Sequence, residues 1–423
     1  MPTLKIVTLG CKVNQYESEY LRQGFARLGY SAAEKGRSAD LCIVNTCIVT
    51  SIGEAKSRKA IRQIARDNPQ AEIIVVGCHA TRSPEEVAAM PGVAEVVTDK
   101  RQLPDLLARR GLIDIPSGID SFGARHRAYV KVQDGCRMGC SYCIIPTVRP
   151  NLTSRPADDV LAEIERLVEG GYREIVLTGI HLGHYGVDLD GPRTNLAALT
   201  GRIAELGGDF RVRISSIEAA EASDELIGLM ADFPDRVCPH LHISMQSGSD
   251  AVLKRMRRRG IDHFMRRCEE VQTRLDRPGM TTDAIVGFPG ETDEEFAETC
   301  AVVRRIGFSK LHVFRFSPRE GTPAAAMEDR VPEQLKQRRA AELARLGDDL
   351  RLEYFERLLD SRSQVLVERS IADSPGMLLG TSGRYAPVEL AGPESLVGRL
   401  VSAVAREVVD REDDVRIVGD LES

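Results

Sequence analysis

The chain has 423 residues, of which 42% are hydrophobic and 28% charged, and its formal net charge at pH 7 is −6. This is the composition of an ordinary globular protein, and at about 150 residues per domain the length predicts roughly three domains. No uncharged apolar run reaches membrane-spanning length, which argues against a membrane protein. The acidic balance argues against a general affinity for nucleic acid, because counterion release rewards a basic surface. A nucleic-acid partner would therefore bind through local basic patches.

The N-terminal stretch MPTLKIVTLG has neither a basic region nor a long apolar segment with a small-residue cleavage site, and it predicts a first strand. We therefore expect a cytoplasmic protein. Its ten cysteines should be reduced, and clustered ones are more typical of metal ligands or catalysts than of disulfides.

Residues 1–116 alternate between strand and helix patterns. The strand candidates LKIVTLG, DLCIVNTC and EIIVVGC are each followed by a polar or amphipathic stretch, such as SIGEAKSRKAIRQIARD. This alternation predicts an α/β domain with a parallel sheet and helices on its faces. The polar segment SGIDSFGARH then serves as a connector.

Residues 122–358 repeat the pattern with six strand candidates, AYVKVQ, REIVLTG, RVRISSI, HLHISMQ, TTDAIVGF and LHVFRFS. Six strand–helix units are too few for the usual eight-stranded barrel, so we expect a partial, open (β/α)6 barrel. The segment from Val331 to Asp360 is rich in helix formers and predicts one long helix. Residues 360–423 contain short strand candidates and predict a small all-β module.

Three cysteines in the first domain occupy equivalent places. Cys11, Cys47 and Cys78 each stand at or just after the carboxyl end of a predicted strand. Those ends share one edge of a parallel sheet, where ligands bind, so the three thiols are expected to converge. The remaining isolated cysteines, Cys42, Cys238, Cys268 and Cys300, are expected to be small buried hydrophobic residues.

A second set lies in the stretch CRMGCSYC, as Cys136, Cys140 and Cys143. It follows the first predicted barrel strand, on the face where such barrels carry their active sites. A structural zinc site would need four N or S ligands, and no second CxxC or HxxxH accompanies this loop. An iron–sulfur cubane usually takes four cysteines, so three would leave one iron open to a chelating substrate.

A C-x3-C-x2-C loop above the first strand of a partial barrel resembles the radical S-adenosylmethionine superfamily. Further motifs resemble its methylthiotransferases over essentially the whole chain: TLGCKVNQYESE, NTCIVT, VGC, CSYCIIP, VLTGIHLGHYG, SSIE, SMQSGSD, DAIVGFPGET and SPREGTPAA. The resemblance implies an N-terminal domain for an auxiliary cluster, a radical domain and a C-terminal module of the TRAM type.

The resemblance also implies the cofactors. Cys11, Cys47 and Cys78 would hold an auxiliary [4Fe–4S] cluster. Cys136, Cys140 and Cys143 would hold a second [4Fe–4S] cluster that cleaves S-adenosylmethionine and so act in catalysis. Residues expected to contact S-adenosylmethionine are Thr178, Gly179, Ser216, Gln246 and Gly287. The implied reaction turns C–H into C–SCH3, and it needs an external electron donor and a sulfur source.

The wording of GCKVNQYES and TGIHLGHYG is most similar to the branch that acts on N6-threonylcarbamoyladenosine beside the anticodon of tRNA. The isopentenyladenosine branch has a GCQMN-like start and the ribosomal-protein aspartate branch a GCPKN-like start, so Lys12 and Val13 favour the first. Three residues depart from the family pattern, where aromatic residues and a glycine are common: His79, Thr147 and Pro150. They concern the loop expected to face the substrate.

Charge leaves an alternative open. Residues 361–423 hold seven arginines and no lysine against eleven acidic residues, a net charge of −4, whereas a module that binds RNA is expected to be basic. An acidic module would suit a basic partner such as a ribosomal protein. The cluster Lys254–Arg259, with Arg266 and Arg267, would bind phosphates or form a solvated helix face. A non-catalytic iron–sulfur or zinc sensor would use the same cysteines but would not need the loops above the barrel.

Overall fold

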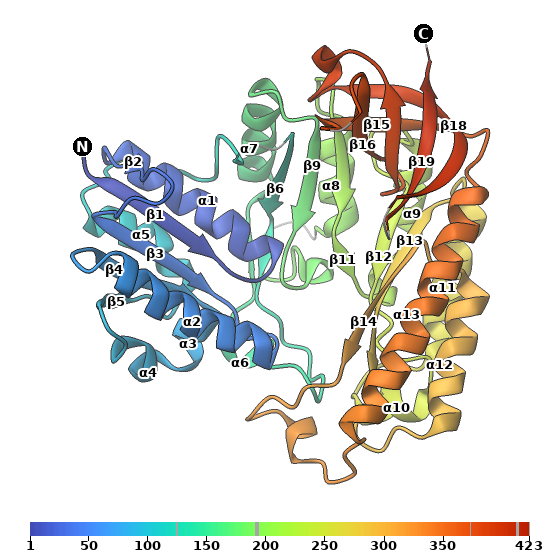
Figure 1. Cartoon of the computed structure of the whole chain (residues 1–423), viewed down its shortest axis with the longest axis horizontal. Coiled ribbons are helices and arrows are strands. Elements are labelled where there is room, and N and C mark those ends of the chain that lie inside the picture. The colour runs from blue at the N-terminus through green and yellow to red at the C-terminus, as the bar shows by residue number, and fades with distance from the viewer. Residues whose placement is uncertain (124–125, 191–193, 373, 412–413, 423) are drawn as a thin grey trace.

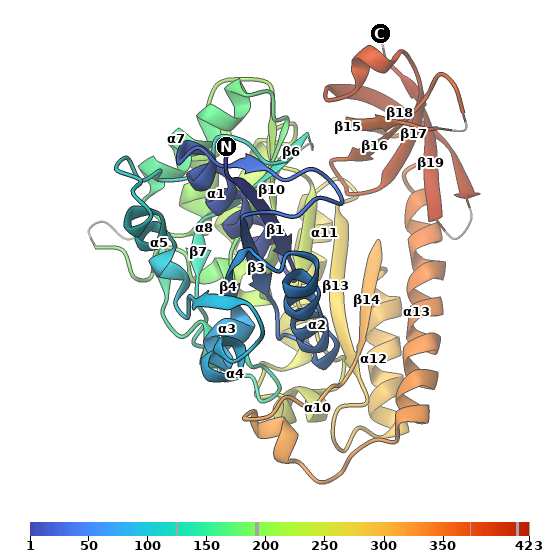
Figure 2. The same ribbon diagram turned by 60° about the vertical axis from the view of Figure 1, so that its left-hand side comes forward.

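The computed structural model describes residues 1–123, 126–190, 194–372, 374–411 and 414–422. Along the chain it forms a parallel sheet with helices, an open barrel and a small closed barrel of strands (Figures 1 and 2). The predicted α/β class and the three kinds of architecture are confirmed. Ala124 and Arg125 of the predicted connector, and Asp373, Glu412 and Asp413 of the acidic residues, lie outside the described residues.

The N-terminal sheet has the strand order β2-β1-β3-β4-β5 and only parallel pairs among its described residues. Alternate side chains of its strands pack on opposite faces. Ile43 joins the core beneath α1 and α5, whereas Val44 joins the core beneath α2 and α4. The elements are β1 (Thr3–Thr8), α1 (Lys12–Arg27), β2 (Ser31–Ala32), β3 (Leu41–Thr46), α2 (Ser51–Asp67), β4 (Glu72–Gly77), α3 (Cys78–Arg82), α4 (Pro84–Ala88), β5 (Val93–Val96) and α5 (Leu103–Arg109).

The central part is an open barrel of parallel strands in the order β6-β9-β10, continued by β11-β12-β13-β14. Ser215 interrupts one predicted strand and divides it into β10 and β11. Within the described residues β6 and β14 do not pair, so the barrel stays open between them. Its strands are β6 (Arg127–Lys131), β9 (Glu174–Thr178), β10 (Arg211–Ile214), β11 (Ser216–Ile217), β12 (His240–Ile243), β13 (Gly279–Val286) and β14 (Lys310–Arg315).

Helices connect these strands and cover the outside of the barrel (Figure 1). In α7, for example, Val160, Ile164 and Leu167 recur at helical spacing and are buried in the main core. The helices are α7 (Ala157–Glu169), α8 (Leu196–Ala204), α9 (Asp224–Asp232), α10 (Asp250–Arg255), α11 (Ile261–Arg274) and α12 (Asp293–Ile306), and two short strands, β7 (Gln133–Asp134) and β8 (Thr153–Ser154), flank the short helix α6 (Ile145–Val148).

The predicted long helix is α13 (Glu333–Glu356), which runs beside β14 and leads into the C-terminal module (Figure 2). That module is a closed barrel in the order β15-β16-β17-β19-β18. Its strands are β15 (Arg362–Ser370), β16 (Met377–Ser382), β17 (Pro387–Ala391), β18 (Leu400–Arg411) and β19 (Asp414–Leu421). Of the described helices, none is long and apolar enough to cross a membrane.

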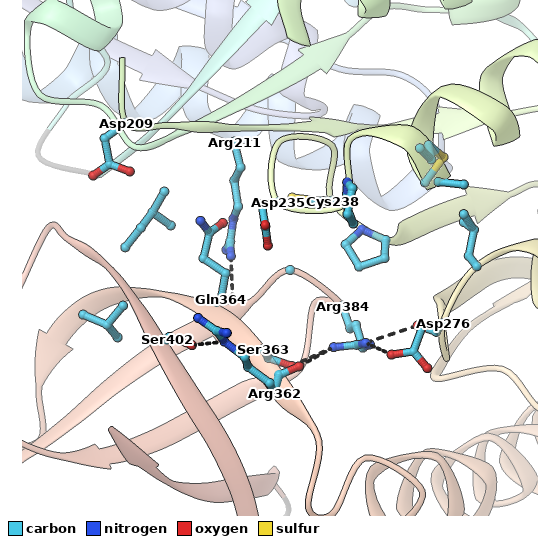
Figure 3. A pocket seen from close by; sticks show the side chains of 18 of the residues that line it. Asp209, Arg211, Asp235, Cys238, Asp276, Arg362, Ser363, Gln364, Arg384 and Ser402 are labelled. Atoms are coloured by element: carbon cyan, nitrogen blue, oxygen red, sulfur yellow. Dashed lines mark hydrogen bonds and ion pairs between the residues drawn. The ribbon is translucent and has the colours of Figure 1, made fainter. Parts of the chain in front are cut away.

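Buried arginines join the amino ends of the barrel strands to the C-terminal module. Arg211 donates to the carbonyl of Gln364 at 2.7 Å, and Arg213 donates to that of Gly383 at 2.9 Å. Beside them lies a cavity of about 600 Å³, which Figure 3 shows between the barrel and the module. On its far side Arg384 pairs with Asp276 at 2.8 Å. The module is thus attached at the end of the barrel opposite the predicted cysteine loop.

Candidate functional site

The first set of cysteines follows three adjacent parallel strands. Cys11 caps α1 just after β1, Cys47 directly follows β3, and Cys78 directly follows β4. The register of β3 and β4 sets Thr46 opposite Gly77, so Cys47 and Cys78 stand at the same level. The sequence prediction that these three residues meet at one sheet edge is therefore consistent with the observed topology.

The backbone around Cys11 is shaped to receive the sulfur of Cys47. Gly10 has a φ of +103°, and a β-carbon there would lie 2.9 Å from Cβ and 3.1 Å from Sγ of Cys47. Asn14, on the first turn of α1, donates to the carbonyls of Leu9 and Thr46 at 2.8 and 2.9 Å. Asn14 therefore ties the loop that carries Cys11 to the end of the strand that precedes Cys47.

The second set lines a cavity of about 140 Å³ above the barrel. Cys136, Cys140 and Cys143 all contribute to its wall. The loop enters through Gly135, whose φ is +82° and whose β-carbon would lie 2.0 Å from the carbonyl oxygen of Asn151. Only glycine fits such a close backbone approach. The predicted convergence of these cysteines above the first barrel strand agrees with this geometry.

Two ion pairs that the sequence analysis missed lie in the same wall. His181 contacts Sγ of Cys136 through Nδ1 at 3.5 Å and pairs with Glu221 through Nε2. Burial alone would lower the pKa of His181, but the bonds to Cys136 and Glu221 raise it to about 10. Arg258 donates to Glu218 at 3.0 Å and reaches Sγ of Cys140 at 3.8 Å. These groups place positive charge beside two of the three sulfurs.

A buried ionic network couples the two sets of cysteines. Arg149 donates to Glu17 of α1 at 2.9 Å and to Asp134 at 2.7 Å, and its carbonyl accepts from the amide of Cys136 at 3.0 Å. Burial alone would raise the pKa of Glu17, but the charges of Arg149 and Lys131 outweigh burial and lower it. Arg149 thus holds the helix behind Cys11 and the loop of Cys136 in one arrangement.

An apolar contact strengthens this coupling. Cys78 is buried in a small cluster with Ile48, Ile144 and Val148. Ile144 directly follows Cys143, so a residue of the first set packs against the segment that carries the second. In the sequence, two apolar residues follow Cys143, but their apolar character does not show which residue they pack against.

The five residues expected to contact S-adenosylmethionine are placed differently. Ser216 and Gln246 line the cavity of the second set, and Gln246 has a left-handed φ of 71°. Thr178 ends β9, and Gly179 follows it just before Ile180 and His181, which line the cavity. Gly287 lies instead against α13, because a β-carbon there would stand 2.3 Å from Cγ of Lys336. The roles of these residues stay predictions.

The basic cluster predicted to bind phosphates divides into two groups. Arg258 belongs to the cavity wall, Arg255 pairs with Glu295 at 2.6 Å, and Arg267 pairs with Asp224 at 2.9 Å. The exposed members are Lys254, Arg257, Arg259 and Arg266. Sequence position alone did not reveal that three of the seven basic residues pair with acidic side chains.

Both sets consist of cysteine thiols, the donors that an iron–sulfur cluster accepts. Every cysteine in the described residues is a free thiol, and burial raises the pKa of Cys143 to about 12, so a bound metal would have to displace protons. Across the described ranges, no group of three or more His, Cys, Asp or Glu side chains is arranged to hold one metal ion. A cubane does not require such a group, because each thiolate binds a different iron.

Comparison with known proteins decides the family. Residues 3–99 match the family model described as uncharacterized protein family UPF0004, and residues 130–303 match that of the Radical SAM superfamily. The chain is 40% identical to a threonylcarbamoyladenosine tRNA methylthiotransferase of Bacillus subtilis, over 95% of this chain and 93% of the relative. The chain belongs to the radical SAM methylthiotransferases. As a member of that family, this methylthiotransferase is an enzyme.

Two further similarities bear on this methylthiotransferase. It is 32% identical to a tRNA-2-methylthio-N(6)-dimethylallyladenosine synthase of Carboxydothermus hydrogenoformans, over 95% of this chain and 96% of the relative. Among solved structures, a radical S-adenosylmethionine methyltransferase from Kitasatospora setae superposes with a TM-score of 0.57 at 13% identity, over 76% of this chain and 74% of that one. The latter likeness concerns the fold, and it agrees with the open barrel described above.

Proposed function

We propose that this methylthiotransferase converts N6-threonylcarbamoyladenosine, next to the anticodon of tRNA, into its 2-methylthio derivative. The observation that carries the proposal is the coupling of two cysteine sets through Arg149, in a chain 40% identical to a threonylcarbamoyladenosine tRNA methylthiotransferase. The C2–H bond of adenine offers no acidic proton, so acid–base groups alone would not open it. A sulfur source held beside a radical site would provide the required proximity.

Family membership implies S-adenosylmethionine and a [4Fe–4S] cluster, and we assign that cluster to Cys136, Cys140 and Cys143. We assign a second [4Fe–4S] cluster to Cys11, Cys47 and Cys78. When bound, the cofactors would supply the radical, the methyl group and the transferred sulfur. The free thiols at adjacent strand ends and around one cavity support both assignments.

The protein's own side chains would then stabilise the cysteine thiolates and orient S-adenosylmethionine in the cavity. Arg258 and His181 would stabilise the thiolate forms of Cys140 and Cys136 by donating hydrogen bonds to sulfur. Glu218 and Glu221 fix the orientation of Arg258 and His181. Ser216 and Gln246, which line the same cavity, would orient S-adenosylmethionine.

The remaining parts of the proposal concern partners and domains. Lys254, Arg257, Arg259 and Arg266 are exposed cations that would contact tRNA phosphates. An external electron donor and a sulfur source would be required, and the reaction would take place in the cytoplasm. We propose the divisions 1–116, 122–358 and 360–423 as the domains for the auxiliary cluster, the radical chemistry and substrate recognition through a TRAM-like module.

The test combines nucleoside analysis with the two cysteine sets. tRNA from cells lacking the gene is digested, and the methylthio nucleoside is measured by mass spectrometry after complementation. Wild type should restore it, whereas Cys140→Ala and Cys47→Ala should not. The purified Cys47→Ala protein should still form 5′-deoxyadenosine from S-adenosylmethionine, and Cys140→Ala should not. Unchanged tRNA in the deletion strain would refute the tRNA assignment and direct attention to ribosomal proteins.

A further inference from the structure

A second cavity, of about 350 Å³, lies inside the open barrel. Its wall is formed by alternate residues of the strands, as expected for side chains that point inward from a barrel. Thr281 and Asp283 come from β13, and Lys310, His312 and Phe314 come from β14. The lining is therefore polar and contains several titratable groups, which is unusual for the packed interior of a barrel.

This cavity adjoins the proposed reaction site on two sides. Ser216 lines both this cavity and the cavity of Cys136, Cys140 and Cys143. Strand pairing places Ser216 opposite His242, His242 opposite Thr281, and Thr281 opposite Lys310, so one register row leads from the radical site to Lys310. On the other side Lys12, which directly follows Cys11, also lines the cavity. The cavity thus touches the wall of the radical site at Ser216 and the residue that follows Cys11.

The positive charges of the cavity fall into two kinds. Arg127 and Arg213 are already engaged with the fully buried Glu174. The side-chain ammonium groups of Lys12 and Lys310, by contrast, form no ion pair or hydrogen bond with any described residue. Both lysines line the same cavity as His312. Burial lowers the pKa of His312, and the charges of Lys310 and Lys12 contribute to that lowering.

The acceptors in the cavity are also accounted for. Asp283 stands 3.3 Å from Nε2 of His242, and Nδ1 of the same ring lies 3.0 Å from the hydroxyl of Thr281. The single carboxylate of the lining therefore lies beside a neighbouring imidazole. The two unpaired lysines leave the cavity suited to one additional anion with hydroxyl or amide groups attached.

We propose that this cavity binds the threonyl group of the substrate, with Lys310 and Lys12 pairing with its carboxylate. The inference rests on the proposed function, since it assigns a site to the N6 substituent. In adenine the N6 and C2 positions lie on the same edge of the base, so a subsite for the substituent must adjoin the site where C2 reacts. Asp283 would accept a hydrogen bond from the threonyl hydroxyl. Lys310 and Lys12 are specificity-determining residues because an apolar N6 substituent would leave them unpaired.

The test measures binding of two nucleosides to the full-length, cluster-loaded protein by isothermal titration calorimetry. One is N6-threonylcarbamoyladenosine, and the other is its methyl ester, which lacks the negative charge. Wild type should bind the acid roughly tenfold or more tightly than the ester, as expected for charge-assisted hydrogen bonds. Lys310→Met should bind both at the ester's affinity, and Lys310→Arg should restore the preference. Lys310 is exposed at the start of β14, so these substitutions should not affect folding.

The matched control is Lys35→Met, which removes an exposed lysine distant in sequence from both cysteine sets and should leave both affinities unchanged. Equal binding of acid and ester by wild type, or an undiminished preference in Lys310→Met, would overturn the assignment of the cavity. Methylthiolation of tRNA is measured in parallel. If wild type forms product and Lys310→Met has an unchanged KM, this inference alone is refuted. If wild type forms no product, the proposed function is refuted.

Discussion

Arg149 is the residue on which the relation between the two cysteine sets depends. Its guanidinium is almost completely buried and pairs with Glu17 and Asp134, which belong to different parts of the chain. A buried charge left without its partner is strongly destabilising, whereas an exposed pair contributes little. The network therefore fixes the position of α1 relative to the cysteine loop. Substituting one of its members is expected to destabilise the protein.

Replacing Arg149 by methionine should leave Glu17 and Asp134 buried with Lys131 as their one remaining cationic partner among the described residues. We expect a loss of roughly 3–5 kcal/mol in the free energy of unfolding of the region around the two sets. Denaturant unfolding followed by circular dichroism measures this loss. Arg345→Met, which removes an exposed arginine of α13, is the control and should change stability by less than about 0.5 kcal/mol. Equal stability of the two variants would show that the network contributes nothing.

At the scale of elements, the turn between β1 and α1 brings Cys11, at the end of one strand, close to Cys47, at the end of the next. Gly10 is left-handed and lies against the side chain of Cys47, so the turn needs a residue without a β-carbon. Gly36 is left-handed as well, with a φ of +83°, but a β-carbon there would meet nothing within 4 Å. An alanine at Gly10 would suffer both backbone strain and a clash with Cys47, whereas an alanine at Gly36 would suffer backbone strain alone.

Gly10→Ala should therefore displace Cys47 and impair the auxiliary cluster. We expect roughly half the iron of wild type after reconstitution, since one of two four-iron clusters is lost, while cleavage of S-adenosylmethionine is retained. Iron analysis and 5′-deoxyadenosine assays measure the two effects. Gly36→Ala carries the backbone strain, about 1–2 kcal/mol, but should keep its full iron content. Iron loss in both variants would contradict the steric argument.

The same scale shows what sequence patterns could predict. All six predicted barrel strands and the long helix are present, because their apolar runs and helix formers reflect local packing. The strands β2, β5, β8 and β19 were missed: β2 and β8 have two residues each, β5 has only four, and β19 alternates charged with apolar residues. Arg258 was misjudged as part of a surface cluster because its partner Glu218 is 40 residues away. Spacing placed the cysteines correctly, but contacts distant in sequence carry no local signal.

At the scale of the whole molecule, Glu174 joins the barrel to the C-terminal module through its arginines. It is fully buried and accepts from Arg211 at 2.8 Å and from Arg213 at 2.9 Å, and both arginines also donate to carbonyls of the module. Burial alone would raise the pKa of Glu174, but the attraction of Arg213, Arg211 and Arg127 outweighs it and holds the pKa well below its ordinary range. The module is thus attached by charges that depend on this one carboxylate.

The lowered pKa of Glu174 gives the attachment a defined pH dependence. The unfolded carboxyl titrates near about 4.3, so its contribution to stability is complete above that pH and is lost as the pH falls through the lower folded value. In calorimetry, the unfolding temperature of wild type should therefore fall as the pH drops below about 4. Glu174→Gln should already be destabilised at pH 7, by roughly 3–5 kcal/mol, and should lack this part of the acid dependence.

Glu368→Gln is the matched control, because Glu368 pairs with Arg127 from a side chain that is 36% exposed. Its loss should cost less than about 1 kcal/mol and leave the acid transition as in wild type. Acid effects that both variants share, including any loss of bound clusters, cancel in the comparison. The remaining difference in acid-dependent stability is due to the buried carboxylate of Glu174. An acid transition in Glu174→Gln identical to that of wild type would mean that another group controls the attachment. The module would then be joined through Arg384 and Asp276, across the cavity seen in Figure 3.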